Sequence, residues 1–154
     1  MTIREQIISA ATTAITDGLA GLDPVPAVYR SRVEAFRPAQ LPAVVIRPES
    51  DAPGDRDGTL CWCPWTLTLA VDVVVDGAPI CQQSDELVEL IHAAMMVSSN
   101  PPGGEDLGLP QYSVDVAPGV CEWEASNDGD HVGVVTMRYA IRYQTSWADL
   151  ALFR

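Results

Sequence analysis

Apolar residues recur along this chain with two spacings, one typical of helices and the other typical of strands. Over residues 2–19 and 82–98 they return every three or four positions, as on one face of a helix. Thr2 and Glu5 have the spacing of a capping box, which favours a helix start at this point. The pattern therefore predicts two helices, each with one apolar face.

Strict alternation of apolar and polar residues predicts strands elsewhere. The clearest case is 60–76, where every second residue is apolar, and 131–145 shows the same pattern. Shorter strands are predicted over 28–35, 43–47, 111–117 and 119–125. Pro48 and Pro118 are expected to end the strands that precede them, because proline lacks the amide proton that a ladder needs.

The predicted order of elements is α-β-β-β-α-β-β-β. The economical packing places both helices on one face of a mainly antiparallel or mixed sheet, which is a two-layer α+β fold. The length of 154 residues suits one domain over 1–154. Two stretches rich in proline, glycine and polar residues, near 48–59 and 99–110, are predicted to be mobile loops.

Composition narrows the classes of partner. The chain carries 21 acidic and 9 basic side chains, a net charge of -12, and all of its cations are arginines. Such a surface repels nucleic acid and anionic membranes, so we predict neither as a stable partner. The N-terminal residues lack the apolar segment of a signal peptide, and no apolar run is long enough to cross a bilayer, so a cytoplasmic setting is expected.

Candidate metal ligands are few and irregularly spaced. Cys61 and Cys63 point to one face of a predicted strand, and zinc could combine them with Cys81, Cys121 or a histidine. No paired C-x-x-C motif is present, however, and the remaining ligands have unrelated spacings. We therefore predict free thiols and no metal centre.

Catalytic motifs are absent from the sequence. His92 and His131 have no nucleophile at a recognised spacing, and no phosphate-binding glycine loop joins a strand to a helix. Glu122 and Glu124 approach an acidic turn at 128–130, which is typical of a solvated face. The sequence predicts no enzyme and no cofactor, although a weak Mg²⁺ or Ca²⁺ site between subunits is left open.

Charge is divided unevenly along the chain. Residues 1–48 hold five arginines against four acids, whereas 49–154 hold four arginines against seventeen acids. A molecule with a small basic patch and a large acidic surface can dock head-to-tail on copies of itself. The residues predicted to form this interface are Arg30, Arg32, Arg47, Glu49, Asp51, Asp55 and Asp57.

Several stretches carry a similarity to a known family. They are MTIREQI at 1–7, VYRSR at 28–32, LPAVVI at 41–46 before an acidic loop, WTLTLAVDV at 65–73, VTMRY at 135–139 and YQT at 143–145. These stretches are spread over nearly the whole chain. In them the chain resembles the tail terminator proteins (minor tail protein U type) of lambda-like, long-tailed bacteriophages and prophages. The Cys61-Trp62-Cys63 segment has no counterpart in that pattern.

The resemblance implies a non-enzymatic virion subunit that assembles into a homohexameric ring. The ring would cap the tail tube, end its polymerisation and join the tail to the head. Its implied partners are further copies of itself, the major tail tube protein and the head–tail connector protein. The implied location is the virion tail, after assembly in the host bacterial cytoplasm.

Three other functions stay open at this point. The chain could be another neck or head–tail completion protein of a phage, which would share its size and style of fold. It could also be a small non-viral ligand-binding module, or an enzyme whose site has no recognised motif.

Overall fold

The computed structural model describes residues 1–55, 62–76, 80–97, 105–109, 111, 113–125, 132–146 and 149–150. Its elements, in chain order, are α1 (Ile3–Leu19), β1 (Ala27–Arg30), the 3-10 helix η1 (Pro38–Gln40), β2 (Ala43–Pro53), β3 (Trp62–Asp76), α2 (Ile80–Met95), β4 (Asp115–Ala125) and β5 (Val132–Ser146). Both helices and both long strands therefore lie close to their predicted positions.

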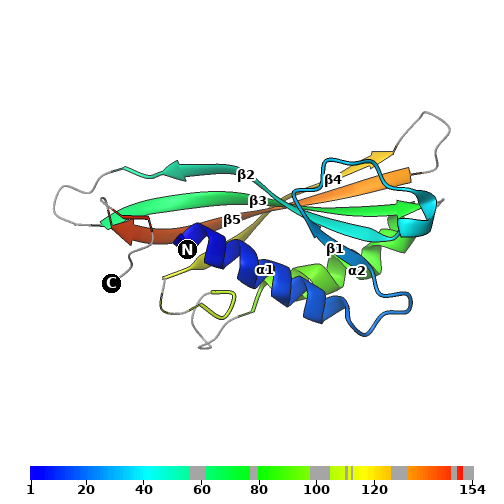
Figure 1. The fold of residues 1–154 in the computed structure, drawn as a ribbon, viewed down its shortest axis with the longest axis horizontal. Coiled ribbons are helices and arrows are strands. Elements are labelled where there is room, and N and C mark those ends of the chain that lie inside the picture. Colours follow the sequence, from blue (N-terminus) through cyan, green and yellow to red (C-terminus); the bar gives the residue numbers. More distant parts are fainter. Residues whose placement is uncertain are drawn as a thin grey trace.

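The five strands form one mixed sheet in the order β1-β2-β3-β5-β4. β1 runs parallel to β2, and every other neighbouring pair is antiparallel. Both helices cover the same face of this sheet (Figure 1). The predicted two-layer α+β fold is confirmed. The described residues have the order α-β-β-β-α-β-β, because Asp115–Ala125 is one strand where two were predicted.

Helix α1 begins where its capping residues predict. The Thr2 hydroxyl accepts a hydrogen bond from the Glu5 amide at 3.2 Å, which satisfies one of the unpaired N–H groups of the first turn. The residues that face the sheet are apolar and buried: Ile3, Ile7, Ile8, Ala11, Ile15 and Leu19. Burial of each large aliphatic side chain contributes about 1.5–3 kcal/mol.

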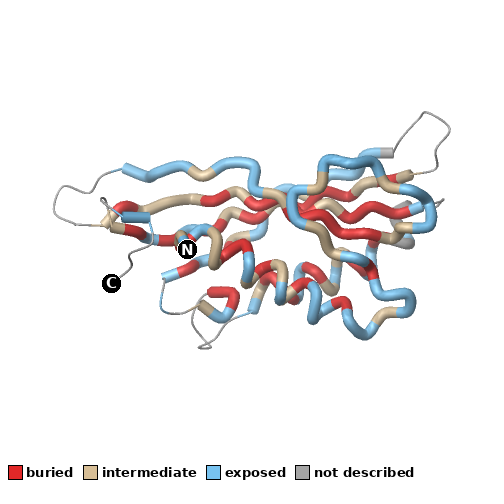
Figure 2. Tube along the Cα trace, viewed as in Figure 1, coloured by how far each residue is buried: buried red, intermediate tan, exposed pale blue. Residues whose placement is uncertain are grey.

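The core lies between the helices and the alternate residues of the central strands. β3 contributes one unbroken phase and β5 another, and the buried parts of both strands run along the middle of the molecule (Figure 2). These core residues are Leu67, Leu69, Val71, Val73, Val75, Val135, Met137, Tyr139, Ile141 and Tyr143. The opposite side of the sheet, which we call the outer face, carries Arg47, Asp72 and Arg138.

Strand β2 does not end at Pro48, so this prediction was wrong. The strand continues to Pro53, and its register with β3 shifts between Pro48 and Ser50. Such a bulge inserts one extra residue and can accommodate a proline, which cannot donate to the ladder. The extra residue is Glu49.

A similar bulge is present in β4, which was predicted as two strands separated by Pro118-Gly119. It is one strand with a register shift between Pro118 and Cys121. A Cβ atom at Gly119 would lie 2.9 Å from the Arg138 carbonyl oxygen, so glycine permits the close approach of the two backbones.

Strand β1 is shorter than the predicted 28–35. It ends at Arg30 because Ser31 has a φ of 48°, in the left-handed region that leaves the extended conformation. The chain then passes over the outer face and returns through η1 to begin β2 (Figure 1). This crossover is what allows β1 and β2 to be parallel.

The predicted loops are only partly described. The prediction of a loop near 48–59 was wrong for residues 48–53, which belong to β2. Within the loop near 99–110, the amides of Asp106 and Leu107 donate to the Val97 carbonyl at 3.0 and 3.2 Å, so 105–109 forms a compact turn against the end of α2. Residues 56–61, 98–104 and 110 lie outside the described part of the chain.

Candidate assembly surfaces

A row of ion pairs crosses the outer face of the sheet. Arg47 on β2 holds Asp72 on β3 through Nε at 2.7 Å and Nη2 at 3.3 Å. The Thr136 hydroxyl on β5 donates to the same carboxylate at 2.7 Å. Because Asp72 faces Thr136 directly in the register, one carboxylate joins three neighbouring strands.

The row continues through Glu49, the bulged residue of β2. It accepts from Arg47 at 3.0 Å and from Arg138 on β5 at 2.8 Å, and Arg138 also donates to Glu122 on β4. These hydrogen bonds, above all the one from Arg138, hold the pKa of Glu49 below its ordinary value. Between the two arginines in the register lies Ala70, which is fully buried.

A second charged group joins α1 to the sheet. Arg30, at the end of β1, forms a two-point contact with Glu5 through bonds of 2.8 and 3.0 Å. The Arg30 hydrogen bond lowers the pKa of the Glu5 carboxyl. Arg4 donates to Asp51 at 3.3 Å, and Asp51 also accepts from the Tyr143 hydroxyl at 2.9 Å.

Arg32 has a different environment from Arg30. Its guanidinium carbon lies 4.6 Å from the ring centre of Tyr29 and 4.4 Å from that of Phe36. Its Nε donates to the Glu34 carbonyl at 3.2 Å. Arg32 and Phe36 line a depression of about 410 Å³ on the outer face, together with Val45 and Val74.

The predicted interface residues are therefore only partly brought together. Four of them are held by charges of the same chain: Arg30, Arg47, Glu49 and Asp51. Arg32 stacks on aromatic rings, Asp55 is exposed, and Asp57 lies outside the described residues. Their predicted contact with a second subunit stays a prediction.

Sequence reasoning missed three members of the ion-pair row: Asp72, Thr136 and Arg138. Each lies on the polar phase of a predicted strand, so alternation placed it on the correct face. The missing information was the strand order, because β3 and β5 are neighbours in space but are separated in the chain by α2 and β4. No local signal in the sequence carries that order.

The free edge of β4 carries an exposed aromatic side chain. Trp123 is 54% exposed and Val120 is 60% exposed, although both belong to a strand of the sheet. On the outward side of this strand, the backbone hydrogen bond found among the described residues is donated by the Val116 amide to the Glu105 carbonyl at 2.9 Å. No described residue forms a backbone hydrogen bond with the outward side of β4 around Trp123, so this part of the edge can pair with another strand.

Two free thiols are described, and neither is activated. Cys63 is buried and Cys121 is partly buried, and burial raises the pKa of both. Cys121 lines a small cavity of about 200 Å³ with His92 and Tyr139. The Tyr139 hydroxyl lies 3.5 Å from His92 Nδ1, and burial raises its pKa to about 12. A thiol kept protonated in this way is a poor nucleophile.

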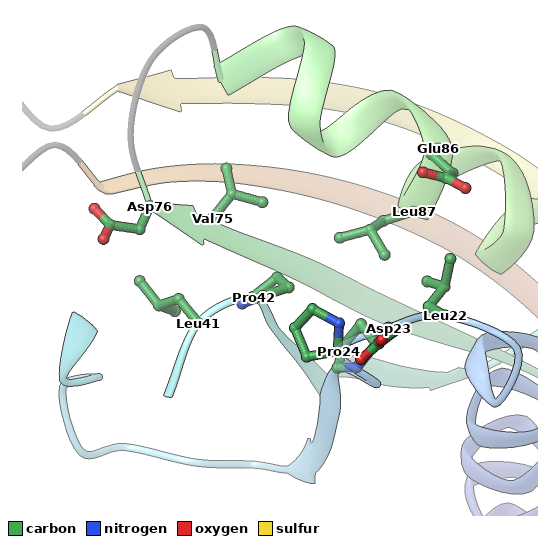
Figure 3. A pocket seen from close by; sticks show the side chains of 10 residues that line it. Leu22, Asp23, Pro24, Leu41, Pro42, Val75, Asp76, Glu86 and Leu87 are labelled. Atoms are coloured by element: carbon green, nitrogen blue, oxygen red, sulfur yellow. The ribbon is translucent and has the colours of Figure 1, made fainter. Parts of the chain in front are cut away.

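Another cavity, of about 290 Å³, lies between the α1–β1 connection, the start of β2, the end of β3 and α2 (Figure 3). Leu22 and Leu87 belong to its apolar wall. Asp76 and Glu86 stand on opposite sides of it, and Asp23 is a third acid (Figure 3). None of the described residues that line the cavity is basic, so this lining does not suit an anion.

Within the described ranges, no three histidine, cysteine or acidic side chains are grouped so that they could hold a metal ion. His131 and the acidic turn at 128–130 lie outside those ranges. Of the helices that are described, none has the length and apolar character needed to cross a membrane.

Comparison with protein-family models gives no match, and comparison with curated proteins gives none either. Among solved structures, the fold is similar to a chain in the virion of a native gene transfer agent particle. The TM-score is 0.56 at 12% identity, over 86% of this chain and 93% of that one. A second solved chain superposes with a TM-score of 0.50 at 15% identity, over 90% of this chain and 94% of that one. The chain shares its two-layer fold with these proteins.

Proposed function

We propose that this chain is a structural virion subunit that forms a ring of six copies on a phage-type tail tube. The ring ends tail polymerisation and joins the tail to the head. The observation that carries this proposal is the similarity of fold, over most of both chains, to a component of a virion. The resemblance of its sequence to tail terminator proteins supports the finer role.

The proposed partners are further copies of the chain, the major tail tube protein and the head–tail connector protein. The role needs complementary surfaces rather than a catalytic group, and the charged outer face with its open strand edge fits that need. Assembly takes place in the bacterial cytoplasm, and the finished ring belongs to the virion tail. A divalent cation at the subunit contacts would reduce repulsion between subunits of net charge -12.

Light scattering and electron microscopy test the proposal together. The purified chain is measured alone and with isolated tail tubes. We expect a species of six times the subunit mass, and rings at one end of the tubes. A monomeric mass under both conditions, with bare tube ends, would contradict the proposal.

A second candidate is another head–tail completion subunit, because the similar chain belongs to a whole virion and the likeness in fold does not select its position. Binding distinguishes the two roles. A tail terminator binds tail tubes that lack heads, whereas a head-side neck protein binds the head portal and leaves tube ends bare.

A ligand-binding module is favoured by one observation, the cavity of about 290 Å³ with three carboxylates in its lining. Its size is near the lower limit for small-molecule sites. A panel of cationic metabolites should leave the thermal midpoint unchanged if the chain is a ring subunit, and should raise it if the cavity is a binding site.

A further inference from the structure

The two open edges of the sheet lie at the same level. Through the register, Val28 on β1 faces Val44, which faces Val73, which faces Val135, which faces Trp123 on β4. β1 and the exposed part of β4 are therefore the two ends of one row across the sheet. Among the described residues, no backbone hydrogen bond reaches the outward side of either strand in this row.

The strand directions suit a contact between these two edges. β1 runs with β2, and three successive antiparallel steps lead from β2 to β4, so β4 runs opposite to β1. If a second copy is placed beside the first at the same level, its β1 meets β4 in antiparallel orientation. An unpaired edge strand is a ready template for such pairing.

On the helix side of the sheet, the two edges match in apolar character. Trp123 lies on that side and is 54% exposed. At the same level Val28 is partly buried against the core, and Val25 just before it is 56% exposed. A large exposed aromatic side chain at the centre of a contact is a common energetic anchor of protein interfaces.

On the outer face, the two edges match in charge. Glu122 and Glu124 lie on β4 at one edge, and at the other edge the Arg32 guanidinium lies 4.6 Å from the ring centre of Tyr29 on β1. Within the described part of the chain, Arg32, Arg37 and Glu124 form no ion pair. Their charges are available to a neighbour.

We propose that the β4 edge of one copy pairs antiparallel with the β1 edge of the next copy, with Trp123 over Val28 and Glu124 near Arg32. The inference rests on the proposed ring and names its contact. It differs from a contact through Glu49 and Asp51, because those acids already hold arginines or a tyrosine hydroxyl of their own chain. The sheets of neighbouring subunits would then form one continuous band.

Charge reversal with rescue by mixing tests this contact. Glu124→Arg and Arg32→Glu are made as separate variants. Glu124 is chosen rather than Glu122, because Glu122 is already bonded to Arg138 and its reversal would disturb the subunit. Each single variant should need at least about tenfold more protein to assemble than wild type. An equimolar mixture should assemble as wild type does, because an even-numbered ring with alternating variants pairs opposite charges at every contact.

Matched variants control for charge and for folding. Glu89→Arg makes the same charge change on an exposed position of α2 and should assemble normally. Trp123→Ala should raise the assembly concentration by about 30-fold, whereas Trp123→Phe should have a smaller effect because an aromatic ring remains. Circular dichroism and the thermal midpoint of each monomer show whether the fold is kept.

Failure of this inference differs from failure of the proposed function. Normal rings from Glu124→Arg and from Trp123→Ala would overturn the edge contact and leave the ring role intact. Single variants that lose assembly without rescue by mixing would also overturn the pairing. A wild-type chain that stays monomeric on tail tubes would overturn both.

Discussion

Asp72 is the residue on which the outer ion-pair row depends most. It is an acid in the central strand β3, its side chain is only 14% exposed, and it accepts hydrogen bonds from Arg47 and Thr136. A carboxylate in this setting is acceptable because its lone pairs are used by a charged donor and a hydroxyl. Removal of Asp72 would leave the Thr136 hydroxyl without this acceptor and would leave Arg47 paired with Glu49 alone.

We therefore expect Asp72→Ala to lower the free energy of unfolding by about 1–3 kcal/mol. Asp76→Ala is the matched control, because Asp76 lies at the exposed end of the same strand and should cost less than about 0.5 kcal/mol. Urea denaturation of both variants measures the difference. Equal losses would show that the ion-pair row adds nothing to stability.

Tyr139 makes the stability of the fold depend on pH in the alkaline range. Burial raises its pKa from 10.0 to about 12, so the folded state favours the neutral phenol. The stabilisation is complete below pH 10 and is lost as the pH rises from 10 towards 12, by about 1.4 kcal/mol for each pH unit. Tyr139→Phe should remove this part of the decline while changing stability little at neutral pH. Thermal midpoints across this range check it, and an unchanged slope would contradict it.

At the scale of elements, the apolar phases of the long strands and helices could be predicted from the sequence, because each faces one continuous core. The two bulges could not. Pro48 and Pro118 signal strand ends in a single strand, and only the pairing with β3 or β5 shows that a shift in register absorbs them. The bulge at Glu49 also decides which arginines this acid meets.

The charged residues of the candidate interface could be predicted from the sequence, but their partners within the chain could not. Alternation identified the charged residues, but it cannot tell which charges become neighbours after folding. Arg30 meets Glu5 because β1 packs beside α1, and Arg47 meets Asp72 because β2 and β3 pair. Trp123 stood in a short, weakly patterned strand, and only the strand order shows that it lies at an edge.

The β4 bulge is open to a direct test with two glycines. Gly119→Ala should destabilise the chain by about 1–3 kcal/mol, because the added Cβ would lie 2.9 Å from the Arg138 carbonyl oxygen. Gly21→Ala, where nothing lies within 4 Å, should be neutral or slightly stabilising. Denaturation midpoints of the two variants provide the comparison, and similar values would argue against a tight bulge.

At the scale of the whole molecule, charge sets the conditions of assembly. Every copy carries a net charge of -12, so bringing copies together costs electrostatic energy unless ions reduce it. The paired arginines on the outer face do not remove this cost, because they neutralise acids of their own subunit.

Mg²⁺ should therefore lower the concentration at which rings form, and a chelator should reverse the effect. Sodium chloride at equal ionic strength is the control for simple screening. A larger effect of Mg²⁺ would support a bridging cation at the subunit contacts. If both salts act equally when assembly is followed by light scattering, the cation site can be discarded.

The direction of the ion-pair row has a mechanical consequence. A ring joined through β4 and β1 would carry hoop tension across its strands, a load that opens backbone ladders one bond at a time. The ion-pair row crosses four of these strands, so in such a ring it would share the load. Its members are Asp72 on β3, Arg47 and Glu49 on β2, Arg138 on β5 and Glu122 on β4. Among the described residues, no ion pair links β1 to β2, whose pairing spans four residues, so in such a ring we expect this ladder to open before the ladders that the row crosses.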